Sequence, residues 1–133
     1  MQYDEFVGEV QNRARLPSRG DTVRAIQATL GTLAERIAQG EADDLAAQLP
    51  LELSVFLEDA ETTERFSVDD FFLRVAAKES ADVPDAAHHA RAVMAVLQEA
   101  VTAGELDDIR GQLPDNYKPF FEAGSEGEMD INV

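Results

Sequence analysis

Apolar residues recur along the chain with the spacing of α-helices. In four segments they return every three or four residues, as one buried face of a helix requires. The stripes are Tyr3, Phe6, Val7 and Val10; Val23, Ile26, Leu30, Leu33 and Ile37; Val68, Phe71, Phe72 and Val75; and Ala90, Val93, Met94, Leu97 and Val101. No β-branched alternation of useful length and no Asn-Gly or Asp-Gly hairpin signal indicates a strand. The pattern predicts an all-α fold.

Glycine and proline mark the ends of these elements. Gly40 and Gly104 follow the long stripes, and a glycine just past the last periodic residue is a C-cap signal. We therefore expect the second helix of each half to end at its glycine. A short third helix with an acidic first turn follows, over 41–49 and 105–113, and a proline separates it from a short fourth helix.

One segment occurs twice, 64 residues apart. Gly-Glu-Ala-Asp-Asp-Leu at 40–45 returns as Gly-Glu-Leu-Asp-Asp-Ile at 104–109, and Gln-Leu-Pro at 48–50 returns at 112–114. Upstream, Phe6 matches Phe71 at an offset of 65, so one residue has been gained or lost in between. The loop at 16–20 is the expected place, because loops absorb changes in length.

This register predicts two tandem repeats of about four helices each, related by an approximate twofold axis and packed as one compact domain. The first repeat spans 1–60, a short linker 61–65 and the second repeat 66–123. Residues 124–133 lack periodicity, and we expect them to form an acidic flexible tail.

The charge balance narrows the classes of function. The chain has 27 acidic and 11 basic residues, a formal net charge of −16 spread over both halves. Acid-rich, lysine-poor surfaces are typical of halophilic microbes, in which concentrated salt screens self-repulsion. Nucleic-acid binding needs clustered positive charge, and Arg13, Arg15 and Arg19 form the only local basic run. We expect no nucleic-acid partner.

The sequence also bears on location and assembly. No apolar run approaches the roughly 18 residues of a membrane span, so we expect no membrane partner. The absence of cysteine is compatible with the cytoplasm, which is the expected location. The sequence leaves the protein partner unknown and a homo-oligomer open.

The repeated motif resembles a known family. Two halves that each carry an aromatic first helix, a long second helix, Gly-Glu-x-Asp-Asp-(Leu/Ile)-x-x-Gln-Leu-Pro and a closing Phe look like the family called domain of unknown function 2267, from about Tyr3 to Glu122. The resemblance implies an all-helical fold of small prokaryotic proteins. It implies no established activity and supplies no catalytic residues.

The acidic turns are candidates for a cation site. Their carboxylates are Glu41, Asp43, Asp44, Glu105, Asp107 and Asp108. Ca²⁺ takes six to eight oxygen ligands, whereas the acids of one helical turn point in different directions, so favourable charge at a helix start is the simpler interpretation. Should a twofold axis bring the two turns together, they would share an ion.

The remaining chemistry is sparse. His88 and His89 are adjacent on a helix and cannot ligate one metal from the same face, so we expect surface or boundary positions for them. No catalytic constellation and no cofactor motif is present in the sequence. We therefore favour a non-catalytic interaction or regulatory module. The alternative is a metal-dependent or acid–base enzyme that uses the paired acidic helix starts.

Overall fold

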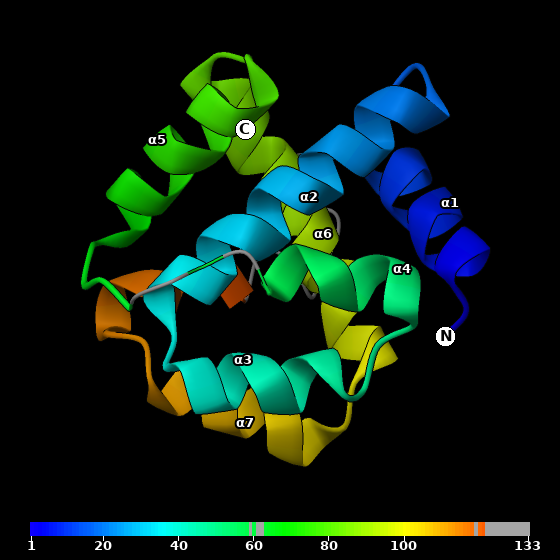
Figure 1. Cartoon of the computed structure of the whole chain (residues 1–133). Helices are drawn as coiled ribbons and strands as arrows, with labels where there is room; N and C mark the ends of the chain where they lie inside the picture. Colours follow the sequence, from blue (N-terminus) through cyan, green and yellow to red (C-terminus); the bar gives the residue numbers. More distant parts are fainter. Residues whose placement is uncertain (59, 61–62, 119, 122–133) are drawn as a thin grey trace.

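The computed structural model describes residues 1–58, 60, 63–118 and 120–121, and its regular elements are all helical (Figure 1). The α-helices are α1 (Tyr3–Ala14), α2 (Arg19–Arg36), α3 (Gln39–Ala46), α4 (Leu51–Ser54), α5 (Val68–Glu79), α6 (Val83–Ala100) and α7 (Ala103–Gly111). Two 3₁₀ helices, η1 (Val55–Leu57) and η2 (Asp115–Tyr117), complete the elements. The predicted all-α fold in one compact domain is confirmed. The predicted tail at 124–133 lies outside the described residues.

The long helices α2 and α6 occupy the middle of the molecule, with α1 and α5 on its flanks (Figure 1). Helix α1 packs against both α2 and α6, and α5 likewise packs against both. Helices α3 and α7 lie side by side below them (Figure 1). Each half therefore completes the core of the other.

Helix lengths follow the register of the sequence repeat. Helices α1 and α5 have 12 residues each, and α2 and α6 have 18 each. The loop between α1 and α2 spans 15–18, one residue more than its counterpart at 80–82. The register change therefore falls in the first loop. Superposition of the two halves about a twofold axis stays a prediction.

An N-cap residue and a buried apolar face define the helices. Ser67 caps α5 by accepting a hydrogen bond from the Asp70 backbone N–H at 3.3 Å, as an N-cap serine commonly does. The apolar stripes then enter one shared cluster of buried residues, in which Leu33 and Leu97 are fully buried at equivalent positions. In the described part of the chain, no helix combines the length and apolar character that a bilayer span requires.

The prediction that Gly40 and Gly104 end the second helices is wrong. Helices α2 and α6 end one turn earlier, because Ile37 and Val101 adopt extended backbone. Both glycines instead lie in the first turn of the next helix, and neither has a left-handed backbone. The long helices are therefore shorter, and α3 and α7 begin earlier, than the periodicity suggests.

Candidate cation site between α3 and α7

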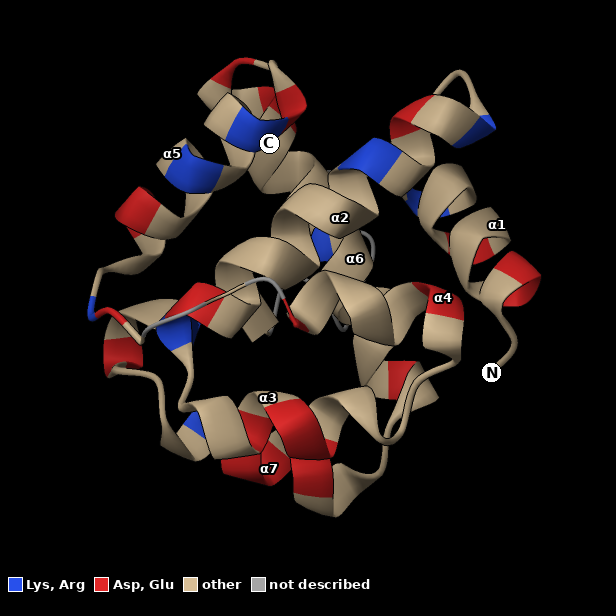
Figure 2. Ribbon diagram, in the orientation of Figure 1, with Lys and Arg blue, Asp and Glu red and all other residues tan. Residues whose placement is uncertain are grey.

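The acidic faces of α3 and α7 meet along the seam between the two halves. Figure 2 shows acidic segments concentrated on both helices. One carboxylate oxygen from each of Glu41, Glu105 and Asp108 lies within 4.8 Å of the other two. Glu105 and Asp108 are three residues apart on α7 and therefore share a helix face, which lies opposite Glu41 on α3. The structure thus brings together three acids from the two motif copies.

Among the acidic residues that the structure describes, only Glu79 and Glu105 are buried, and of these two only Glu105 lies beside other motif acids. The residue is 6 % exposed, and its Oε2 has no hydrogen-bond partner among the described residues. The Oε2 of Glu41 is also buried without such a partner. A buried carboxylate oxygen without a bond costs free energy, because water has been removed and nothing replaces it. The pair therefore requires a proton or a cation to be stable.

The electrostatics point the same way. Burial raises the pKa of the Glu105 carboxyl to about 8. The hydrogen bond that its protonated form shares with Glu41, and then the charges of Glu41, Asp44 and Asp108, add to the rise. Near neutral pH, Glu105 consequently holds a proton unless a positive ion takes its place. Metal binding at such a site would displace that proton.

The other predicted ligands lie outside this group of three. Asp43, Asp44 and Asp107 are exposed, and none of them belongs to the set of mutually close oxygens. Asp44 acts on Glu105 only through its charge. Its repeat equivalent, Asp108, is a member of the cluster, so the two halves contribute unequally.

Two glutamines that the sequence analysis overlooked tie the helices together. The Oε1 of Gln112 accepts a hydrogen bond from the backbone N–H of Ala38, the N-cap of α3, at 2.7 Å. The Oε1 of its repeat equivalent, Gln48, accepts from the backbone N–H of Thr102, the N-cap of α7, at 2.8 Å. Each half therefore supports the start of the other half's third helix. The sequence contains a sign of this role, because the Gln of Gln-Leu-Pro occurs in both copies of the motif.

Gln112 also reaches the acidic cluster. Its Nε2 donates to the Oε1 of Glu41 at 3.2 Å, which orients that carboxylate. A fixed second layer of this kind is common around ligands of metal ions. Carboxylate and amide oxygens are the ligands that Ca²⁺ and Mg²⁺ prefer, and no imidazole of the described residues belongs to this cluster. The arrangement is therefore suited to a hard divalent cation.

The two histidines lie away from this site. Both are partly buried, and the Nδ1 of His89 lies 2.6 Å from the Oε1 of Glu79. This hydrogen bond raises the pKa of His89 above its ordinary value, against the opposing effect of burial. His88 and His89 do not meet a third ligand among the described residues. The hydrogen bond between His89 and Glu79 therefore joins α6 to the end of α5, and the two histidines form no metal centre with the described residues.

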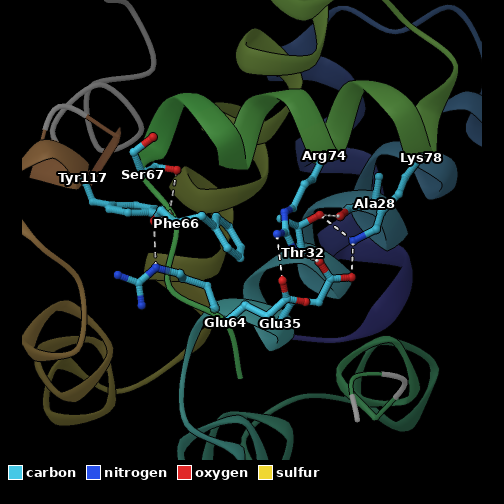
Figure 3. Close-up of polar contacts among 10 residues, drawn as sticks. Ala28, Thr32, Glu35, Glu64, Phe66, Ser67, Arg74, Lys78 and Tyr117 are labelled. Atoms are coloured by element: carbon cyan, nitrogen blue, oxygen red, sulfur yellow. Dashed lines mark hydrogen bonds and ion pairs between the residues drawn. The ribbon is translucent and has the colours of Figure 1, made fainter. Parts of the chain in front are cut away.

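A further polar network joins α5 to α2. Glu35 accepts a hydrogen bond from the Nη1 of Arg74 at 3.0 Å and another from the Nζ of Lys78 at 2.7 Å (Figure 3). The Nζ of Lys78 also donates to the hydroxyl oxygen of Thr32 (Figure 3). Every charge here has a partner, so the network has the character of a structural contact between the halves.

The chain matches a known protein family over most of its length. A family profile described as an uncharacterized conserved protein, DUF2267, matches residues 3–120, nearly the whole chain. No curated protein matches the sequence.

Proposed function

We propose a non-catalytic, cation-responsive role for this chain, which belongs to the uncharacterised conserved protein family DUF2267. In this proposal a divalent cation bridges α3 and α7 and fixes the two halves against each other. Because these helices come from different halves, occupancy of the site changes how firmly the whole molecule is held together. The module then presents a different surface to a protein partner with and without the ion.

The observation that carries the proposal is the buried, unbonded oxygen of Glu105 beside two other carboxylates. Acidic residues at a helix start are ordinarily exposed and favoured by the helix dipole. Glu105 lies in the first turn of α7 but is buried against Glu41. A favourable dipole alone gives no reason to bury two carboxyl groups side by side, where they must share a proton or a cation.

An acid–base enzyme is the second candidate. A carboxyl with a pKa near 8 has the property that a general acid or base needs at neutral pH. Such a group must also reach a substrate, and Glu105 is only 6 % exposed. The geometry therefore favours binding over catalysis.

We further propose that the protein works in the cytoplasm of a salt-accumulating cell. The support is the net charge of −16 with only two lysines, Lys78 and Lys118. Concentrated salt would screen the repulsion that this charge creates.

Calorimetric titration with Ca²⁺, Mg²⁺ and Mn²⁺ tests the cation site. The protein is first stripped with a chelator and measured near pH 8, where Glu105 gives up its proton most easily. The informative variant is E41Q/E105Q, and its matched control is D43N/D107N. Both remove one acid from each motif copy, but the control leaves the cluster intact.

We expect saturable binding of at least one of these cations to the wild type and to D43N/D107N, with loss of binding in E41Q/E105Q. Proton release on binding would identify Glu105 as a ligand. Equal binding by all three proteins would mean that the ions bind diffusely to the acidic surface. Absence of binding to the wild type would overturn the proposal.

A further inference from the structure

Positive charge is concentrated at one end of the α3–α7 pair. Within the described part of the chain, six of the 11 basic residues make no ion pair: Arg15, Arg36, Arg65, Arg91, Arg110 and Lys118. Four of these six line two neighbouring cavities. In Figure 2, blue segments lie beside the left end of the α3–α7 pair, whereas the middle of the pair is red.

The two cavities adjoin at Leu113 and Pro114, which line both. The larger, of about 500 Å³, is lined by Arg36 and Arg65 together with the C-terminal end of α7. The smaller, of about 270 Å³, is lined by Arg110 and Lys118. In a chain with 27 acids, the only acidic side chain among the described residues of either lining is Asp115. The surface here is therefore basic, against the charge of the whole molecule.

Arg36 is the most buried of these basic residues. It is 8 % exposed, and its Nε donates to the backbone carbonyl of Phe66 at 2.9 Å. Its guanidinium lies over the rings of Phe66 and Tyr117, at 5.8 and 5.5 Å from their centroids. The Tyr117 hydroxyl donates to the same carbonyl (Figure 3). These contacts fix the guanidinium but leave both Nη groups without a hydrogen bond to a described residue.

The fold alone does not require an arginine at this position. Arg36 is the last residue of α2, and the last residue of the equally long α6 is Ala100. Tyr117, which packs on Arg36, corresponds to Leu53 in the first half. The end of α6, the counterpart of the end of α2, thus carries no charged residue at the equivalent position. No acid among the described residues pairs with Arg36, and its Nη groups are not buried, so the side chain holds an unpaired positive charge open to an anion in the cavity.

We infer that the double cavity around Arg36 is a binding site for a small oxyanion, a phosphate or carboxylate group of a metabolite. The planar fork of a guanidinium matches two oxygens of either group. The volume of the larger cavity falls in the range of small-molecule sites, so the group would belong to a molecule larger than the bare ion. The larger cavity adjoins the cation site, because its lining includes Gln112, which donates to Glu41, but the two proposed sites use different charged residues.

Calorimetric titration with inorganic phosphate and with succinate, at fixed ionic strength in KCl, tests the inference. The first variant is R36A, which gives the end of α2 the alanine that ends α6 at position 100. The second is R65Q, which removes an exposed charge from the same cavity. R15Q is the matched control, because Arg15 is also exposed and makes no ion pair with a described residue, yet lines neither cavity.

We expect at least one of the two anions to bind the wild type and R15Q equally. R36A and R65Q should each weaken that binding by about tenfold or more, the effect of losing a charge-assisted hydrogen bond. The preferred anion identifies the group as phosphate or carboxylate. Should R36A fail to fold, R65Q decides the question alone. Binding that R65Q and R15Q weaken equally, or no binding of either anion to the wild type, would overturn the inference.

Discussion

At the scale of single residues, Glu105 is the motif acid whose pKa the fold raises. A carboxyl whose pKa is raised on folding favours the folded state only while it keeps its proton. The benefit is complete below the unfolded pKa of 4.5 and is lost as pH rises through the folded value of about 8. Above that value the folded protein holds a buried negative charge beside Glu41, which a bound cation would neutralise.

Replacing Glu105 with Gln tests this linkage. Without divalent cations, the free energy of unfolding of the wild type should fall relative to E105Q between pH 4.5 and 8. At the upper end, E105Q should be more stable by roughly 1–3 kcal/mol, since it carries no buried charge. Chemical denaturation at a series of pH values measures the difference.

His89 also loses stabilisation as pH rises, because its pKa is raised on folding. The comparison of wild type with E105Q removes this shared contribution. A difference between the two proteins that does not change with pH would show that Glu105 does not titrate in this range.

At the scale of helices, the sequence predicts which segments are helical, but it does not predict which side chains of different helices meet. Apolar periodicity identifies the four main helices, because a helix that buries one face needs an apolar residue at every third or fourth position. It misplaces Gly40 and Gly104, because Ile37 and Val101 continue the apolar stripes although their backbones are already extended. The motif identifies the acids of the candidate site. Which of them meet depends on how α3 packs on α7, and no local pattern contains that information.

The reciprocal glutamines give an element-scale prediction. Q112A should destabilise the protein by about 1 kcal/mol, because the backbone N–H of Ala38 loses its acceptor. Q48A should cost less, because the Thr102 hydroxyl still caps α7 by accepting from the Glu105 backbone N–H. Urea denaturation of both variants measures the order. A larger loss in Q48A would mean that these bonds do not hold the helix starts.

At the scale of the whole molecule, the charge of −16 predicts stability that depends on salt. Low ionic strength leaves repulsion between surface acids unscreened, so the thermal midpoint should rise clearly between dilute buffer and about 2 M KCl. Salts that are excluded from the surface also strengthen apolar burial, so a second protein is needed. A variant with about eight surface acids changed to Gln should show a smaller rise. An undiminished rise would contradict the electrostatic explanation and remove the support for a halophilic origin.

The most direct test of the cation site is an anomalous difference map from crystals grown near pH 8 with Mn²⁺. Mn²⁺ accepts the same oxygen ligands as Mg²⁺ and is visible by its own scattering. The proposal predicts one strong peak between α3 and α7, within bonding distance of oxygens from Glu41, Glu105 and Asp108. It would be contradicted by a map in which Mn²⁺ occupies only exposed acids such as Asp43 and Asp107, or in which the three carboxylates stay in place with no peak between them.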